Sequence, residues 1–225
     1  MDKLTSISQG AEPEQIGPWL ADRLHDRAWR DCRVALIAGG KSNLTYLVSS
    51  RAGELVFRRP PLGHILPTAH DMGREHRVMA ALGTTAFPVP RTLLYSPADD
   101  NPLGVGCYAM ERVVGHICRD ELPPGYAEEP VHCQAIAEAL VDTLAELHMT
   151  DPARIGLADF GRPEGFMDRQ LNLWSKQWER SKAEDVPELD ALRAALGDTK
   201  PDSFPQSLVH GDFRLDNCVP CSTGR

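Results

Sequence analysis

The sequence lacks the features that mark secreted, membrane-spanning and repeat proteins. Its first residues, Met1–Ser6, contain no basic stretch followed by an apolar run, so we expect no signal peptide. No apolar stretch approaches the roughly 20 residues that cross a bilayer. Internal repeats and low-complexity runs are also absent from the sequence. These absences favour a globular protein of the cytoplasm with no membrane partner.

Positive charge is scarce as well. The chain has 24 Lys and Arg residues but 32 Asp and Glu residues, which gives a formal net charge of -8. We therefore expect no nucleic acid and no anionic membrane as the main partner. Hydrophobic residues make up 42% and charged residues 25% of the 225 residues, as in an ordinary globular protein. This length suits one large domain or two small lobes.

The six cysteines do not predict a disulfide framework, because an even count without a secretory context is not sufficient. Cys218 and Cys221 have the CxxC spacing of half a zinc site or of a redox pair. No second CxxC and no His-x3–5-His follows them, so ordinary thiols are favoured. A thiol or metal function for this pair stays open as an alternative.

The front part of the sequence predicts a sheet that carries helices. Residues 14–30 place Ile16, Leu20, Leu24 and Trp29 on one face, which predicts a leading helix. Short β-branched and apolar runs predict five strands, at residues 33–38, 44–48, 55–58, 91–96 and 105–112.

A second helix is predicted between the third and fourth of these strands. Thr68 and Asp71 have the S/T-x-x-D/E spacing of a helix start, and helical periodicity continues to Leu82. Five strands with one helix between them predict a mostly antiparallel sheet.

The back part of the sequence predicts helices instead. One amphipathic helix ends near His148, and others are predicted over residues 166–182 and 188–196. The change at about residue 113 predicts two lobes with a cleft between them. The expected domains are a leading segment at 1–30, a front lobe at 31–112 and a helical back lobe at 113–225.

The segment 208–217 carries the most specific pattern, H-x-D-x-x-x-x-N, formed by His210, Asp212 and Asn217. This is the spacing of a kinase catalytic loop. In such a loop the Asp orients the attacking hydroxyl, and the Asn five residues later holds a magnesium ion on the phosphates. The alternative interpretation is a polar surface turn.

Residues 209–217 resemble the catalytic loop of the aminoglycoside phosphotransferase and choline kinase superfamily. The resemblance is greatest to the branch that includes the kinase-like domain fused to some acyl-CoA dehydrogenases, and it runs from about residue 33 to the end. It implies an α+β, bilobal protein-kinase-like fold and ATP-dependent phosphate transfer to the hydroxyl of a small-molecule acceptor. Asp212 and His210 would then be catalytic, and Asn217 would bind Mg²⁺.

The same resemblance implies a nucleotide site. Its residues would be Gly39, Gly40, Ser42, Asn43, Val56, Arg58, Glu75, Glu111 and Val113. The glycine loop would approach the phosphates, Arg58 would bind them and Glu75 would pair with Arg58. Val56 would pack on adenine, and the hinge residues Glu111 and Val113 would hydrogen-bond it. The alternatives are a plain hairpin turn, a solvated strand end at Arg58 or Arg59, and an exposed helical Glu75.

The sequence departs from the family pattern after Asn217. A second metal-binding carboxylate is expected just beyond the catalytic loop, yet residues 218–225 contain none. The chain is therefore expected to be truncated, with an incomplete back lobe, weak magnesium binding and impaired turnover. The alternative function is a non-catalytic, pseudokinase-like remnant that binds nucleotide or a protein partner, with possible association through uncovered back-lobe faces.

Overall fold

The structure, a computed structural model, describes residues 4–5, 9–37, 43–63, 71–118, 121–201 and 206–220. The chain divides into two compact units. The first comprises Met1–Glu146 and His210–Arg225, and the second comprises Leu147–Val209. The domain boundaries expected at residues 30 and 112 both fall inside the first unit, and they stay predictions.

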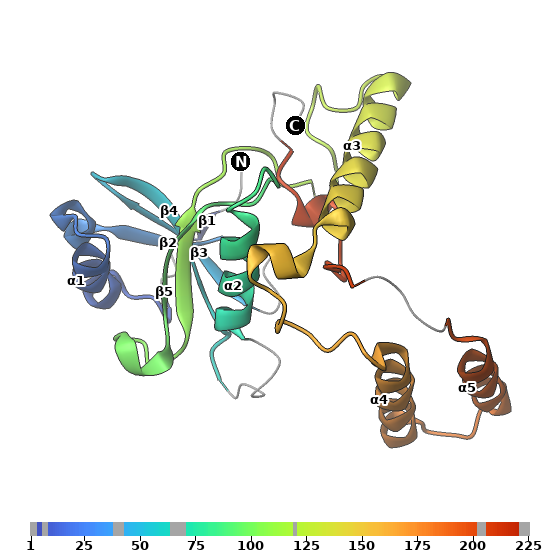
Figure 1. The fold of residues 1–225 in the computed structure, drawn as a ribbon. Coiled ribbons are helices and arrows are strands. Elements are labelled where there is room, and N and C mark those ends of the chain that lie inside the picture. The colour runs from blue at the N-terminus through green and yellow to red at the C-terminus, as the bar shows by residue number, and fades with distance from the viewer. Residues whose placement is uncertain are drawn as a thin grey trace. The chain divides into compact units, whose positions relative to one another are not determined.

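The first unit contains a six-stranded antiparallel sheet (Figure 1). Its strands, in spatial order, are β1 (Leu4–Thr5), β2 (Arg33–Ile37), β3 (Leu44–Ser50), β4 (Gly53–Arg59), β6 (Cys107–Glu111) and β5 (Thr92–Ser96). The five strands predicted from apolar, β-branched runs are all present. Strand β1 was not predicted, because two residues are too few to show an alternating pattern.

The leading helix of residues 14–30 was predicted as one element, and this was wrong. Helix α1 (Pro13–Arg23) ends at its cap, and a separate 3-10 helix, η1 (Arg27–Asp31), follows. Between them His25 adopts a positive φ of 54°, which breaks the helical path. The carboxylate of Asp26 then accepts a hydrogen bond of 2.9 Å from the Ala28 amide and starts η1.

Helix α1 covers one face of the sheet (Figure 1). Ile16 and Leu20 project from it and are fully buried, and Trp29 of η1 joins them. The sheet contributes apolar side chains from β2, β3, β4 and β6 to this core: Val34, Tyr46, Val48, Leu55, Phe57, Cys107 and Ala109. The predicted apolar stripe therefore packs as expected, although it spans two helices rather than one.

The opposite face carries helix α2 (Met72–Leu82), which contacts β5 and β6. Its N-cap is Asp71, whose Oδ1 accepts a hydrogen bond of 2.9 Å from the Arg74 amide. The helix therefore begins after Asp71, and the predicted cap Thr68 lies outside the described residues. The N-cap carboxylate satisfies an amide that has no partner within the helix.

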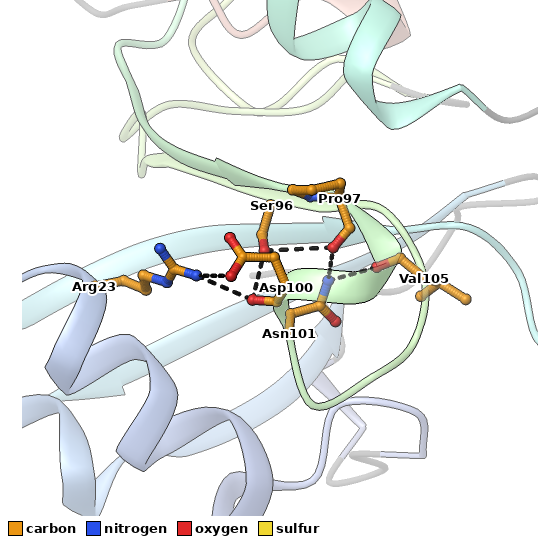
Figure 2. A network of polar contacts seen from close by, with 6 residues as sticks. All are labelled: Arg23, Ser96, Pro97, Asp100, Asn101 and Val105. Carbon is orange, nitrogen blue, oxygen red and sulfur yellow. Dashed lines mark hydrogen bonds and ion pairs between the residues drawn. The ribbon is translucent and has the colours of Figure 1, made fainter.

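A polar network ties α1 to the connection between β5 and β6 (Figure 2). The Arg23 guanidinium pairs with the Asp100 carboxylate and donates to its carbonyl oxygen over 3.1 Å. Ser96 donates to the same carbonyl over 3.0 Å. The Asn101 amide donates to the carbonyls of Pro97 and Val105, over 2.5 and 2.9 Å. This polar loop is thereby held against the end of α1.

The remaining helices are α3 (Pro130–Met149), α4 (Phe166–Ser181) and α5 (Pro187–Thr199). They agree with the helices predicted from the back part of the sequence. Helices α4 and α5 contact each other within the second unit, and several of their apolar side chains are exposed, including Leu173, Trp174 and Leu192. Among the described residues no helix is long and apolar enough to cross a membrane.

Candidate functional site

Strand β4 directs Val56 and Arg58 to the face of the sheet that carries α2. Side chains alternate along a strand, and in an antiparallel pair the residues directly opposite share a face. In β6, Met110 lies opposite Val56 and Tyr108 lies opposite Arg58. Val56 is buried. The predicted positions of Val56 and Arg58 on one face therefore agree with the strand register.

Arg58 lies within a polar group that we call the Glu75 cluster: Asn43, Arg58, Glu75 and Tyr108. Nη2 of Arg58 lies 3.2 Å from Oε2 of Glu75. The Tyr108 hydroxyl donates to the same Oε2 over 3.1 Å, and the Asn43 amide donates to Oε1 over 2.5 Å. Arg58 is thus not a solvated strand end, and Glu75 is not an unpaired helical residue.

Tyr108 enters this cluster from the interior of the unit. It is 1% exposed, and burial raises the pKa of its hydroxyl; the nearby Arg58 lowers this pKa and Glu75 raises it. A phenol with a raised pKa stays protonated at neutral pH, so Tyr108 is a hydrogen-bond donor to the carboxylate. This contact had no signal in the sequence, because the register between β4 and β6 decides which residue lies opposite Arg58.

One nitrogen of Arg58 finds no hydrogen-bond partner among the described residues. Nε is buried, and its N–H donates to no acceptor in that part of the chain. A buried donor without an acceptor costs roughly 1–3 kcal/mol. An anion at this position would satisfy it, and guanidinium matches the geometry of phosphate oxygens. The donor set around Arg58 therefore fits a phosphate group.

The neighbouring Arg59 has a different environment. It points to the α1 face, where it is buried. Its Nε donates to the Pro60 carbonyl over 3.1 Å, and Nη1 donates to the Gly10 carbonyl. On the same face the Tyr46 hydroxyl donates to the Gln9 carbonyl over 2.7 Å. These two side chains hold the segment that precedes α1, so Arg59 has a structural role.

The predicted hinge follows β6. Glu111 ends this strand, and its amide donates to the Arg91 carbonyl over 2.9 Å. Its carboxylate accepts from the Arg91 amide over 2.9 Å and lies 3.6 Å from the Arg91 Nε. Glu111 is thus fixed at the strand end, with half-buried Val113 two residues later. The predicted phosphate-loop residues Gly39, Gly40 and Ser42 lie outside the described residues.

The predicted catalytic residues form a second group, in the loop that leads into the 3-10 helix η4 (Leu215–Asn217). Nδ2 of Asn217 donates to the Asp212 carbonyl over 2.9 Å and to Oδ2 of Asp212 over 3.0 Å. The Asp212 amide donates to Nδ1 of His210 over 3.3 Å. Gly211 has a φ of 82°, which favours glycine at this turn. The three residues of the H-x-D-x-x-x-x-N pattern are thus joined by hydrogen bonds within one compact turn.

Arg214 belongs to this turn although the sequence pattern did not single it out. Its Nε lies 3.5 Å from Oδ1 of Asp212, and its Nη2 pairs with Asp216. The Asp212 carboxylate therefore contacts Asn217 through one oxygen and Arg214 through the other. The Asp212 side chain is nevertheless 67% exposed, so its carboxylate is accessible from solvent. An Arg two residues after the predicted catalytic Asp is the only sequence signal for this contact.

The chain after the turn is fixed by a close approach to Gly115. A β-carbon at Gly115 would lie 2.5 Å from Cγ1 of Val219 and 2.8 Å from the Pro220 carbonyl oxygen. The Tyr126 hydroxyl donates to the same carbonyl over 3.2 Å. The segment that follows the predicted hinge therefore packs directly against the segment that follows the predicted catalytic loop.

Residues 33–219 match the model of the phosphotransferase enzyme family. The chain belongs to this family. A solved structure from Ralstonia eutropha JMP134, described as a "putative aminoglycoside phosphotransferase", superposes with a TM-score of 0.76 at 30% identity. The superposition covers 92% of this chain and 60% of that one. The predicted membership of the aminoglycoside phosphotransferase superfamily and the α+β fold are both confirmed.

Curated relatives of this phosphotransferase-family chain include acyl-CoA dehydrogenase family members. Member 11 from Rattus norvegicus is 40% identical over 187 residues, and member 10 from Mus musculus is 36% identical over 180 residues. These alignments cover 83% and 80% of this chain but only 24% and 17% of the relatives. The chain thus spans about a quarter or less of these relatives' length, and the predicted resemblance to their branch is confirmed.

Metal binding by this phosphotransferase-family chain depends on few ligands. Across the described residues no group of three or more His, Cys, Asp and Glu side chains could hold a metal ion. Mg²⁺ prefers oxygen ligands, and the Nδ2 of Asn217 is committed to Asp212, which leaves the amide oxygen for a metal. Cys218 is a free thiol, and Cys221 of the CxxC pair lies outside the described residues.

Proposed function

We propose that this chain binds ATP and transfers a phosphoryl group to a hydroxyl of a small-molecule acceptor. The observation that carries the proposal is the environment of Arg58. Its guanidinium is fixed by Glu75 at one end, and at the other end its buried Nε has no partner in the part of the chain that the structure describes. In a phosphotransferase-family fold this position suits the phosphates of a nucleotide.

The other predicted residues take their roles around this arginine. Val56 and the hinge residues Glu111 and Val113 would contact adenine, while Gly39, Gly40, Ser42 and Asn43 would border the phosphates. Mg²⁺, held by Asn217 and by phosphate oxygens, would neutralise charge on the transferred group.

Asp212 would orient the acceptor hydroxyl and receive its proton, since its carboxylate is 67% exposed, whereas that of Asp216 in the same turn is 26% exposed and pairs with Arg214. His210 would shape the turn, because its Nδ1 accepts the Asp212 amide. Arg214, whose Nε lies 3.5 Å from Asp212 Oδ1, would help to orient that carboxylate. Cytoplasmic location remains a prediction from the sequence.

Nucleotide binding without transfer is the second candidate function. It is favoured by the neutral amide of Asn217, because no group of three or more His, Cys, Asp and Glu side chains that could hold a metal ion gathers among the described residues. Magnesium is usually bound through one or two carboxylates plus phosphate. A site that relied mainly on the Asn217 amide would bind ATP with little help from the metal and would release it unchanged.

Calorimetric titration with ATP tests the proposal, followed by a phosphate-transfer assay against hydroxyl compounds. We expect the wild type to bind ATP, and Arg58→Ala to bind it at least about tenfold more weakly, because hydrogen bonds to charged groups contribute roughly 1.5–3 kcal/mol. Arg51→Ala is the matched control, since Arg51 is exposed in the turn between β3 and β4. Equal affinities for all three proteins would contradict the proposal. Binding without any transfer would favour the second candidate function.

A further inference from the structure

The carboxylate of Glu75 receives donors from three separate places in the first unit. Arg58 reaches it from β4, Tyr108 from β6, and Asn43 from the residue just before β3. We propose that Tyr108 and Asn43 are positioning residues, which act through Glu75 to hold the Arg58 guanidinium in its phosphate-binding orientation. This inference rests on the proposed function, because it assumes that Arg58 meets the phosphates.

Tyr108 is placed to fix the half of the carboxylate that contacts Arg58. Its hydroxyl donates to Oε2, the same oxygen that lies 3.2 Å from Nη2 of Arg58. The two residues are also direct neighbours across the β4–β6 ladder. A carboxylate held by one donor can rotate about its last bond, whereas a second donor on the same oxygen restricts that rotation. Tyr108 thereby restricts the position of the guanidinium.

The tyrosine itself has little freedom. Its side chain is 1% exposed, and the hydroxyl also lies 3.6 Å from Sδ of Met79 on α2. The ring lies beside that of His76, with centroids 6.1 Å apart. A side chain packed on several sides keeps one rotamer, so its hydroxyl is a fixed reference point for Glu75.

Asn43 holds the other oxygen of the carboxylate. Its Nδ2 donates to Oε1 over 2.5 Å, and the side chain is buried. Asn43 directly follows Ser42, the last residue of the predicted phosphate loop. The hydrogen bond therefore joins the residue just before β3 to Glu75 on α2.

A matched control exists on the opposite face of the sheet. Tyr46 is also fully buried, and its hydroxyl donates one hydrogen bond of 2.7 Å to the Gln9 carbonyl. Replacing either tyrosine by Phe removes one buried hydroxyl and its main hydrogen bond, so Tyr46→Phe controls for the loss of stability that such a change causes. Only Tyr108 is linked to Arg58, and only its replacement should change phosphate recognition.

The test compares ATP with adenosine, which shares the base and sugar but lacks phosphates. We expect Tyr108→Phe to raise the ATP dissociation constant by about three- to tenfold, the range expected for one buried hydrogen bond. Its adenosine dissociation constant should stay within about twofold of wild type, since Tyr108 has no role in base recognition. Tyr46→Phe should alter neither constant. Asn43→Leu, which keeps the size of the side chain and removes its donor, should reproduce the ATP-selective loss.

The coupling through Arg58 is tested by a double mutant. In an Arg58→Ala background, Tyr108→Phe should cause no further loss of ATP affinity, because the group that it positions is absent. A ¹⁵N-resolved spectrum gives a readout that needs no nucleotide. The Arg58 Nε–H resonance should shift or broaden in Tyr108→Phe and stay unchanged in Tyr46→Phe.

The outcomes separate this inference from the proposed function. A wild type that does not bind ATP would overturn both. A wild type that binds ATP while Tyr108→Phe binds it equally well, or loses ATP and adenosine in equal proportion, would overturn the positioning role alone. If Tyr108→Phe does not fold, Asn43→Leu is measured alone and in the Arg58→Ala background. An ATP-selective loss in the single variant with no further loss in the double variant would support the positioning role, whereas a further loss in the double variant would show a direct contact of Asn43 with ATP and overturn it.

Discussion

Two neighbouring arginines on β4 show how strand geometry gives different roles to two side chains of the same type. Arg58 points to the α2 face and pairs with Glu75, whereas Arg59 points to the α1 face and binds the Gly10 and Pro60 carbonyls. The alternation of side chains along β4 was predictable from the sequence. It placed Val56 and Arg58 on the same face of the sheet. The partner of Arg59 was not readable, because it lies 49 residues away in a loop.

Replacing each arginine by Ala should separate stability from ligand binding. Arg59→Ala should lower the free energy of unfolding by about 2–3 kcal/mol, because it leaves two carbonyl groups without a charged donor. It should leave the ATP affinity of the remaining folded protein nearly unchanged. Urea unfolding and calorimetric titration give the two quantities. Arg58→Ala should instead lower the ATP affinity and leave the free energy of unfolding nearly unchanged. A similar loss of stability in both variants would contradict the assignment of a structural role to Arg59 and a binding role to Arg58.

His76 should make stability depend on pH. It lies between the rings of Tyr95 and Tyr108, with centroids 5.2 and 6.1 Å away, and burial lowers the pKa of its imidazole. The native state therefore binds fewer protons than the unfolded chain, whose His pKa is about 6.5. The His76 contribution is fully present above that value and is lost as the pH falls through the lowered pKa of the native state.

Urea unfolding at about pH 7.5 and about pH 5.5, on either side of the usual His value, measures this effect. The free energy of unfolding should fall at the lower pH in the wild type. In His76→Gln, which keeps a polar side chain but cannot titrate, the fall should be smaller. An equal fall in both proteins would show that other groups cause it.

At the scale of elements, the strands and helices were largely predictable, and their ends were not. Runs of four to eight residues in the sequence located β2 to β6, which are five to seven residues long. The helix predicted over 14–30 breaks at His25, a residue whose positive φ has no sequence signal. Helix α2 begins after Asp71, because the carboxylate nearest the first turn caps it. Within the Glu75 cluster, Arg58 and Glu75 were predicted, whereas the contact with Tyr108 depends on sheet register.

The start of α2 should matter because this helix carries Glu75. Asp71→Ala removes the acceptor for the Arg74 amide and should cost about 1 kcal/mol of stability, as is typical of an N-cap. Asp71→Ser retains a capping oxygen and should restore most of this loss. The midpoint and slope of urea unfolding provide the comparison. Equal stability of the Ala and Ser variants would argue against a capping role.

Gly115 should control the segment beyond the catalytic turn. A β-carbon there would overlap Val219 and the Pro220 carbonyl, so Gly115→Ala should displace residues 219–220 and with them the end of the turn that carries Asn217. The expected result is a smaller effect of Mg²⁺ on ATP affinity, with adenosine binding unchanged. Gly161→Ala is the control, because nothing lies within 4 Å of a β-carbon at that position. If Mg²⁺ changed the ATP affinity equally in Gly115→Ala and Gly161→Ala, this result would contradict a role of Gly115 in placing the segment after the turn.

At the scale of the whole molecule, the sequence pattern and the fold agree on the family. The catalytic-loop spacing, the arginine on the third strand of the predicted sheet and the acid on α2 all occur in a chain that belongs to the phosphotransferase enzyme family. The identity of the acceptor molecule was not predictable, because the three motifs would serve the nucleotide, the metal and only the reacting hydroxyl of the acceptor. Several apolar side chains of α4 and α5 are exposed, and the association of back-lobe faces with a partner stays a prediction.

The most direct test of a single nucleotide site uses ATP with Mn²⁺ in place of Mg²⁺. The paramagnetic ion broadens the side-chain resonances of residues near the bound phosphates. The Nε–H signal of Arg58 and the Nδ2 signals of Asn217 should both broaden when Mn²⁺ and ATP are added together, while the Nε–H signal of Arg51 should not. If only the Arg58 signal or only the Asn217 signals broadened, or if none of them did, Arg58 and Asn217 would not bind the same triphosphate.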